Sequence, residues 1–353
     1  MTLPPVRDDL TDLVGYHSAQ VTVDVRLNTN ESPYPPPDGW REAFLAELDT
    51  AAYHRYPDRR AAALRTAIGA LHGVGPEQVI AANGSNEVLQ ALCLAYGGPG
   101  RSVAVFEPTY ALHSHIARIT GTSVAVGERR ADFTLALDEV RRVLADARPA
   151  ITFLCTPNNP TGLVEPQALV EAVVEAAPGL VVVDEAYAQF APWSAMTLLG
   201  EDRPLVVTRT FSKTWAMAAM RLGYLVGPAE VVEACERVLL PYHLDVAAQA
   251  AGRLALRFQA EMEARVAAVV AERERLTAAL RTLPVEVWPS GANFVLFRPE
   301  AAEAGAVWKG LVELSVLVRD CSSWPRLAGC LRVTVGAPAE NDAFLTALRE
   351  VLV

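Results

Sequence analysis

A lysine among small hydroxyl residues is the most informative chemical feature of the sequence. Thr210-Phe-Ser212-Lys213 follows the run LVVTR, and Arg221 comes eight residues after the lysine. A lysine at a strand end can form an imine with an aldehyde if its pKa is lowered enough to supply free amine. Thr210 and Ser212 can donate hydrogen bonds to a phosphate, and Arg221 can pair with it. Taken alone, the string is a weak signal, and a surface lysine is the more common explanation.

A carboxylate and a phenol follow another apolar run. Asp184 and Tyr187 lie in DEAY, directly after LVVV. A carboxylate that emerges from a buried strand is costly unless it has a cationic partner. Asp184 could pair with a protonated pyridine nitrogen, and Tyr187 could hydrogen-bond the phenolic oxygen of the same ring. A capping aspartate at a strand end is the alternative.

Three further strand ends carry polar or aromatic side chains. The turn-forming segment TPNNPTG after ITFLC would aim the Asn159 amide over the sheet edge, unless it is only a loop. Gly84, Ser85 and Asn86 follow VIAA and open a helix, whose first free N–H groups can cradle a phosphate. Tyr110 after SVAVF could stack on a planar ring, or it could pack in the core. Together these side chains predict a site for a phosphorylated aldehyde at one sheet edge.

The elements that position these residues follow from the alternation of apolar runs with amphipathic stretches between about residues 60 and 226. That alternation predicts an α/β fold with a mostly parallel, helix-covered sheet, whose carboxyl edge is where ligands bind. Asp245 is a plausible N-cap for one long helix that reaches about Leu283. The predicted organisation is a segment 1–40 that joins the small domain, a large domain 41–245, an interdomain helix 246–283 and a small α+β domain 284–353.

Composition excludes several partner classes. The chain has 353 residues, a net charge of −10, and no basic stripe that could neutralise a nucleic-acid backbone. The absence of a signal-like start and of any apolar run as long as a membrane span predicts a cytoplasmic protein without a membrane partner. The five scattered cysteines predict buried reduced thiols. His113 and His115 lack a matching third ligand, so no metal is expected.

At this point the chain resembles a known family. LNTNESPYPPP, RYPD, NGSNE, EPTY, TPNNPTG, VVDEAY, RTFSKTWAMAAMRLGY and CLRVTVG are similar to segments of the fold-type I pyridoxal-phosphate aminotransferases, and within them of the histidinol-phosphate aminotransferases. The resemblance implies a large domain with a mostly parallel seven-stranded sheet, a smaller α+β domain and the cofactor pyridoxal 5'-phosphate. It also implies a homodimer that transfers an amino group from a small-molecule donor to a 2-oxo acid, with histidinol phosphate and 2-oxoglutarate as the expected pair.

The resemblance also implies roles for individual residues. Lys213 would form the Schiff base and move the substrate proton. The other cofactor contacts would come from a set that binds the ring or the phosphate, with Tyr56 reaching in from a second subunit: Gly84, Ser85, Asn86, Tyr110, Asn159, Asp184, Tyr187, Thr210, Ser212, Arg221 and Tyr56. The substrate contacts would come from Arg332 on an α-carboxylate, from Arg319 and Tyr16 on a distal phosphate, and from Asn159.

Two departures from the family pattern leave the substrate open. Thr214-Trp215 replaces the smaller or Ala-Phe pairs that usually follow the lysine, and Cys321 stands where phenylalanine is common. An aromatic aminotransferase or a decarboxylase on the same fold is therefore the alternative. A regulator with an aminotransferase-like domain would need a basic helix-turn-helix segment before this chain, and none is expected.

Overall fold

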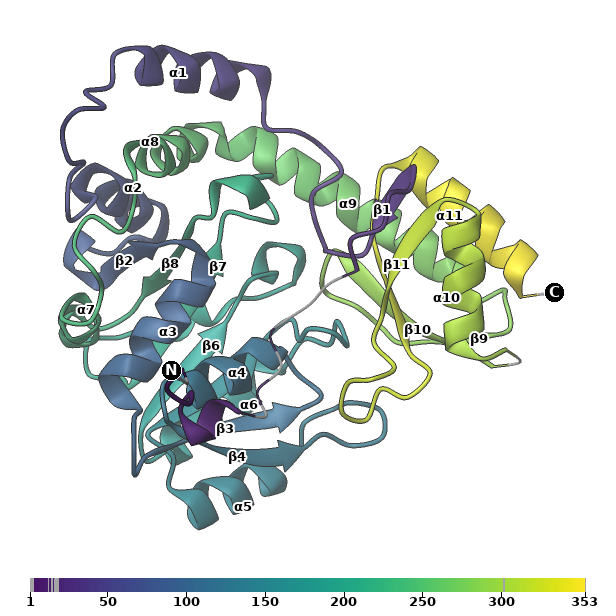
Figure 1. The fold of residues 1–353 in the computed structure, drawn as a ribbon, viewed down its shortest axis with the longest axis horizontal. Coiled ribbons are helices and arrows are strands. Elements are labelled where there is room, and N and C mark those ends of the chain that lie inside the picture. The colour runs from purple at the N-terminus through teal and green to yellow at the C-terminus, as the bar shows by residue number, and fades with distance from the viewer. Residues whose placement is uncertain (1–2, 12, 14, 16–18, 301, 353) are drawn as a thin grey trace.

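The computed structural model describes residues 3–11, 13, 15, 19–300 and 302–352. A seven-stranded sheet forms the larger part of the molecule and a five-stranded sheet the smaller part (Figure 1). The larger sheet has the strand order β2 (Val79–Ala82), β8 (Gly223–Val226), β7 (Leu205–Thr210), β6 (Leu180–Asp184), β5 (Ile151–Cys155), β3 (Ser102–Glu107) and β4 (Ser123–Glu128).

All pairings in the larger sheet are parallel except those of β8, which runs antiparallel to both of its neighbours. The predicted mostly parallel seven-stranded sheet is thus confirmed. Parallel strands covered on both faces are mostly apolar, and β6 is buried throughout with four apolar residues before Asp184. Leu180 and Val182 face one core cluster, whereas Val181 and Val183 face the other.

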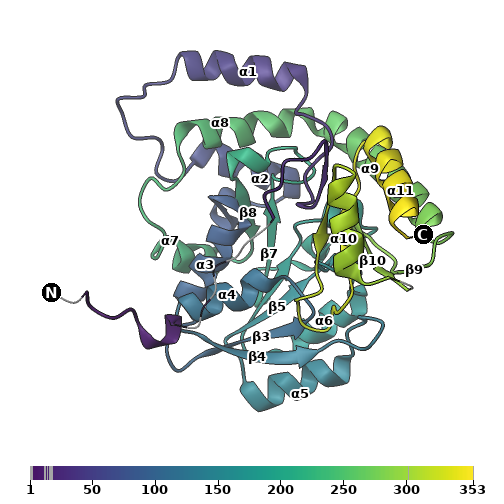
Figure 2. The same cartoon turned by 45° about the vertical axis from the view of Figure 1, so that its right-hand side comes forward.

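Helices cover both faces of this sheet (Figure 2). One face packs against α3 (Gly84–Tyr96), α4 (Ala111–Ile119) and α7 (Ala229–Glu236), and the other against α5 (Leu137–Ala147) and α6 (Gln167–Ala176). At the β2 and β8 edge, a third cluster joins α1 (Asp38–Asp49), α2 (Ala62–His72) and α8 (Val246–Ala255). The cysteines at 93, 155, 235, 321 and 330 are all buried and free, as the sequence predicts.

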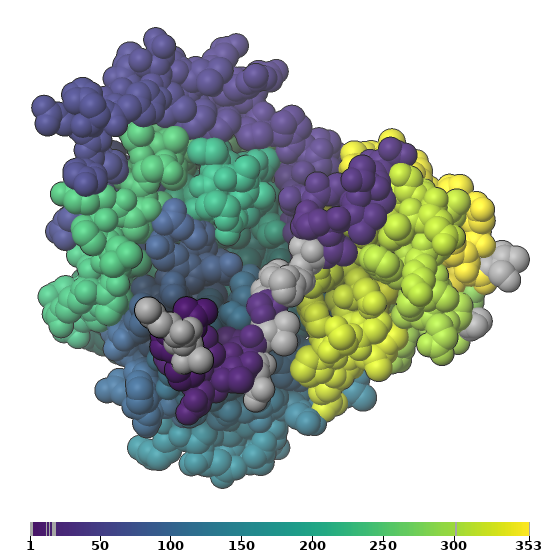
Figure 3. Space-filling view, viewed as in Figure 1, coloured from purple at the N-terminus to yellow at the C-terminus, as the bar shows by residue number. Residues whose placement is uncertain are grey.

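The smaller sheet combines both ends of the chain. Its order is β1 (Val25–Leu27), β11 (Val316–Asp320), β12 (Leu331–Thr334), β10 (Phe294–Pro299) and β9 (Val285–Val287). β1 pairs in parallel with β11, so the purple segment in Figure 3 lies against the yellow-green C-terminal part. α9 (Gln259–Leu280), α10 (Ala304–Glu313) and α11 (Pro338–Val351) complete this part.

The helix expected to run from Asp245 to about Leu283 is interrupted. The Asp245 side chain caps α8 by accepting from the backbone N–H of Ala248 at 2.7 Å, as predicted. A 3-10 turn over Leu256–Phe258 then separates α8 from α9, because Phe258 leaves the helical region at φ −111° and ψ 38° and packs its ring against Gly39 of α1. The predicted domain boundaries themselves stay a prediction.

Candidate active site

A cavity of about 380 Å³ opens at the carboxyl ends of β5, β6 and β7. The N-terminal segment and β12 close its other side. Most of the residues that the sequence nominates line it together: Ser85, Asn86, Tyr110, Asn159, Asp184, Tyr187, Thr210, Ser212, Lys213, Arg221 and Arg332. The side chains that were predicted to meet at one sheet edge therefore line a single cavity in the folded chain.

Lys213 follows β7 and extends into this cavity. Its amine donates a hydrogen bond to the backbone oxygen of Thr29 at 2.9 Å. The pKa of the Lys213 amine is lowered to about 7, first by burial and then by the positive charge of Arg332. Near neutral pH a large share of this lysine is therefore the free amine, which is the form that attacks an aldehyde.

Asp184 lies at the end of β6 with a fixed orientation. One carboxylate oxygen contacts Nε2 of His113 at 3.0 Å, and the other accepts from the backbone N–H of Ala186 at 3.2 Å. The His113 ring is stacked on Phe153 at 4.7 Å and meets the Tyr110 ring edge-on at 5.4 Å. His113 thus supports Asp184, a role that the isolated HxH motif did not reveal.

A cradle for an anion forms where the first turn of α3 meets Arg221. Gly84 has φ +76°, and an added Cβ would lie 2.9 Å from a guanidinium nitrogen of Arg221. Thr210 and Ser212 line the same cavity, and the Thr210 hydroxyl donates to Ser212 Oγ at 3.0 Å. Free N–H groups at a helix start, two hydroxyls and one guanidinium form a donor set that suits a phosphate.

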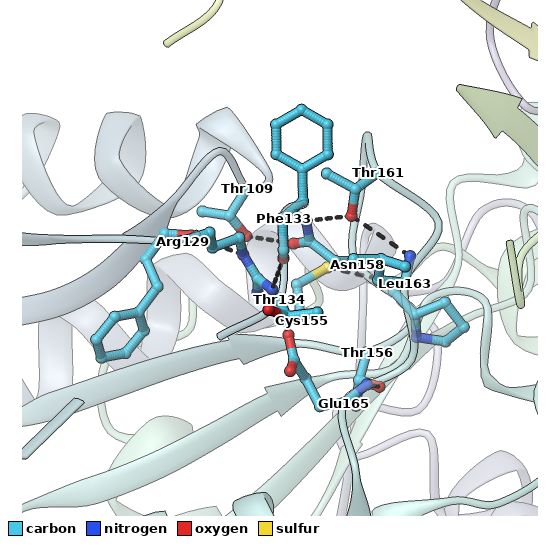
Figure 4. Close-up of polar contacts among 12 residues, drawn as sticks. Thr109, Arg129, Phe133, Thr134, Cys155, Thr156, Asn158, Thr161, Leu163 and Glu165 are labelled. Atoms are coloured by element: carbon cyan, nitrogen blue, oxygen red, sulfur yellow. Dashed lines mark hydrogen bonds and ion pairs between the residues drawn. The ribbon is translucent and has the colours of Figure 1, made fainter. Parts of the chain in front are cut away.

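The loop that carries Asn159 is held by a buried polar network (Figure 4). The Asn158 side chain accepts from Thr109 Oγ1 at 2.8 Å and donates to Thr161 Oγ1 at 2.9 Å. Below it, Arg129 forms a buried ion pair with Glu165 at 2.5 Å. Asn158 and Glu165 therefore fix the loop, which leaves the neighbouring Asn159 amide free to face the cavity.

Arg332 is a buried cation on the far wall. Its guanidinium donates to Asn159 Oδ1 at 2.5 Å and to the backbone oxygen of Asn28 at 2.9 Å, and it lies over the Phe294 ring. Among the ion pairs of the described residues, none includes Arg332. Because a buried cation needs a counter-charge, this position suits an anionic substrate group.

Three nominated residues are not among the residues that line the cavity. Arg319 lies on β11 directly opposite Arg332 and stacks over the Trp324 ring at 5.3 Å. Tyr56 is 81% exposed and stacks on Tyr242 instead. Gly84 contributes through its backbone beside Arg221. The fourth remaining nominee, Tyr16, lies outside the described residues.

The sequence reasoning missed the contribution of residues 28–31. Asn28, Thr29, Asn30 and Glu31 line the cavity, and the Asn30 amide donates to the Tyr187 hydroxyl at 3.0 Å. Burial raises the pKa of that phenol, which keeps it protonated as a donor. A signal was present, because NTNE follows the apolar alternation VTVDVRL as the other polar groups follow their strands.

Comparison with known proteins places these features in a family. Residues 22–348 match the sequence model for aminotransferase class I and II. The chain belongs to this aminotransferase family. The aminotransferase is 47% identical to the histidinol-phosphate aminotransferase of Frankia casuarinae over 99% of this chain and 90% of that protein. It is 46% identical to the one of Streptomyces avermitilis over 98% and 96% of the two chains.

Solved structures show the same fold. A histidinol-phosphate aminotransferase from Sinorhizobium meliloti, in complex with pyridoxal 5'-phosphate, superposes on this aminotransferase with a TM-score of 0.85 at 23% identity, over 94% of this chain and 91% of that one.

No helix in the described ranges is both long and apolar enough to cross a membrane. Within those ranges, no cluster of three or more histidine, cysteine or acidic side chains could hold a metal ion.

The cavity fits pyridoxal 5'-phosphate, the cofactor of this aminotransferase family. Pyridoxal 5'-phosphate needs an amine, an anion cradle and an acid for its ring nitrogen. Lys213 supplies an amine with a lowered pKa, Gly84 and Arg221 border a cradle, and Asp184 offers a carboxylate that lines the same cavity. These donor types are what the group requires.

Proposed function

We propose that the protein is a pyridoxal-phosphate-dependent aminotransferase that converts L-histidinol phosphate and 2-oxoglutarate into imidazole-acetol phosphate and L-glutamate, a step of histidine biosynthesis. The observation that carries the proposal is the 47% identity, over 99% of the chain, to a protein named histidinol-phosphate aminotransferase. The cavity supports it, because one anion cradle and one separate buried cation serve a phosphorylated cofactor and an anionic substrate.

The bound cofactor would supply an electron sink that stabilises negative charge at the substrate Cα. Lys213 would hold the cofactor covalently and, once released, would accept the proton from the substrate Cα and return it to C4′ of the cofactor, two bonds from Cα. Its pKa of about 7 suits this exchange, because a group that both takes and gives a proton works best when its pKa lies near the working pH.

The other residues of the cavity would bind and orient. Asp184, held by His113, would keep the ring nitrogen protonated, and Asn159 and Tyr187 would donate to the ring oxygen. Tyr110 would cover the ring face. Gly84, Ser85, Asn86, Thr210, Ser212 and Arg221 would hold the phosphate.

Arg332 and Arg319 would bind the anionic end of the substrate. Glutamate presents a carboxylate there, whereas histidinol phosphate carries a phosphate and no carboxylate. Arg319 and Arg332 are directly opposite on antiparallel strands, which puts their side chains on the same face of the sheet. Two guanidinium groups on one face suit a doubly charged phosphate.

The same proposal includes a homodimer. Tyr56 is 81% exposed and is not among the residues that line the cavity of its own chain, so a contact to the cofactor phosphate would be made in a neighbouring subunit. A cytoplasmic location also stays a prediction of the sequence.

A half-reaction with purified enzyme tests the substrate. The enzyme loaded with cofactor is mixed with L-histidinol phosphate or with L-phenylalanine, and the visible spectrum is followed as the cofactor gains the amino group. Fast, saturable conversion by histidinol phosphate alone is expected. A preference for phenylalanine would replace the proposed substrate with an aromatic amino acid.

The cofactor attachment has a sharp control, because the chain contains two lysines, Lys213 and Lys309. After reduction with borohydride, peptide mass spectrometry should find the cofactor on Lys213. Lys309, exposed on α10, should stay unlabelled, and Lys309→Ala should retain the visible absorbance that Lys213→Ala loses. Label on Lys309, or absorbance retained in Lys213→Ala, would contradict the assignment.

A further inference from the structure

Two carboxylates line the cavity, and one of them has no role yet. Asp184 is held by His113 and by the backbone of Ala186. Glu31 accepts one hydrogen bond from Thr29 Oγ1 at 2.8 Å through Oε2. No arginine, lysine or histidine of the described residues forms an ion pair with Glu31. A carboxylate oxygen is thus left to accept from a ligand.

The backbone around Glu31 is firmly positioned. Asn30 is 1% exposed and has a φ of 55°, and its N–H donates to Thr334 Oγ1 at 2.9 Å. Its backbone oxygen accepts from the Asn293 amide at 3.1 Å. The preceding residue, Thr29, accepts from the Lys213 amine. Glu31 is therefore built into the wall beside the reacting lysine.

The chemistry of the proposed substrate decides what this carboxylate would meet. Histidinol phosphate has three polar parts: a phosphate, an amine and an imidazole. The phosphate requires cations such as Arg332, and the amine must reach the place of Lys213. The ring N–H of the imidazole is the donor that remains, and a carboxylate is a strong acceptor for it.

We infer that Glu31 accepts a hydrogen bond from the imidazole N–H of the amino donor and thereby selects an imidazole side chain over a phenyl one. This inference rests on the proposed function and assigns Glu31 as a residue that determines which amino donor is preferred. A phenyl ring offers no donor, and it would leave the carboxylate to be partly desolvated without compensation. A hydrogen bond to a charged group is strong enough to give about a tenfold preference.

The test compares L-histidine with L-phenylalanine, which share the amine and the carboxylate and differ only in the ring. The half-reaction kcat/KM ratio, histidine over phenylalanine, is measured for the wild type, Glu31→Met and Glu31→Gln. We expect the ratio to fall about tenfold in Glu31→Met and less in Glu31→Gln, which keeps an acceptor. Glu42→Gln, exposed on α1, is the matched control and should leave the ratio unchanged.

A change that acts through Lys213 or through folding affects both donors and cancels in the ratio. Calorimetry with imidazole-lactate and phenyllactate, which lack the amine and cannot react, gives the same comparison as dissociation constants. A ratio that is unchanged or higher in Glu31→Met overturns the inference. Conversion of histidinol phosphate by the wild type is measured separately. Failure of that reaction would contradict the proposed function, whereas the ratio tests only the role of Glu31.

Discussion

Lys213 gains its reactivity from its surroundings. Burial of the amine, together with the positive charges of Arg332 and Arg221, lowers its pKa to about 7 from a reference value of 10.5. Between these two pH values the unfolded chain binds more protons at this site than the folded chain does. The lysine therefore opposes folding most strongly below pH 7, and this cost disappears as the pH rises towards 10.5.

Replacing Lys213 should therefore stabilise the cofactor-free protein in a pH-dependent way. The free energy of unfolding gained by Lys213→Met is expected to be about 4 kcal/mol larger at pH 6 than at pH 10. Urea denaturation at both pH values measures the difference. Lys309→Met should show no comparable pH dependence, and a constant gain for Lys213→Met at all pH values would argue against a perturbed lysine.

At the scale of elements, the site depends on where helices and loops begin. α3 starts at Gly84, whose positive φ and missing Cβ allow Arg221 to approach the first turn. The loop after β5 depends on the buried Arg129 and Glu165 pair. Both features hold a segment of backbone in position. Each can therefore be tested by a substitution that disturbs this positioning and leaves the side chains that would contact the cofactor unchanged.

Gly84→Ala should weaken cofactor binding by at least tenfold, because the new methyl group meets the Arg221 guanidinium. Gly73→Ala is the matched control, since Gly73 also has a positive φ of 69° but nothing within 4 Å of the added carbon. Both variants should lose about 1 kcal/mol of stability from strain. Equal cofactor dissociation constants in the two variants would remove Gly84 from the cradle.

Glu165→Ala should destabilise the protein by about 3–5 kcal/mol, because it leaves the buried Arg129 guanidinium without a counter-charge. The double variant Arg129→Met, Glu165→Leu should recover most of the loss. Glu233→Ala breaks an exposed pair with Arg237 and should cost under about 0.5 kcal/mol. Chemical denaturation measures all three, and a small loss in Glu165→Ala would mean that the pair does not hold the loop.

At the scale of the whole molecule, the two sheets bring distant segments to one cavity. Residues 28–31 follow β1, which is anchored in the smaller sheet, whereas Lys213 follows β7 of the larger one. Arg332 on β12 then reaches Asn159 on the loop after β5. The proposed dimer would add Tyr56 from outside the chain.

Mixing two variants, one with weakened cofactor binding and one without the reacting lysine, tests that dimer. Tyr56→Phe should raise the cofactor dissociation constant about tenfold, and Lys213→Ala should abolish activity. If Tyr56 acts in the neighbouring subunit, hybrid dimers contain one site with both wild-type residues, so mixing should restore activity at low cofactor concentration. Without restoration after confirmed subunit exchange, Tyr56 would have to act in its own chain or not at all.

The sequence by itself determined the strands of the larger sheet and most side chains at their carboxyl ends. Buried parallel strands are mostly apolar, and polar residues gather where the strand leaves the core. Lys213, Asp184, Asn159 and Arg221 were therefore visible from local pattern, and the family resemblance added roles for them. The start of α8 at Asp245 was likewise a local signal.

Only the tertiary structure decided which distant residues share the cavity. The contribution of Glu31, the support of Asp184 by His113 and the stacking of Arg319 on Trp324 depend on contacts between segments far apart in the chain. The break between α8 and α9 also depends on packing, because Phe258 turns towards Gly39 of α1. Local pattern records which residues leave a strand, whereas the packing of two sheets sets which of them meet.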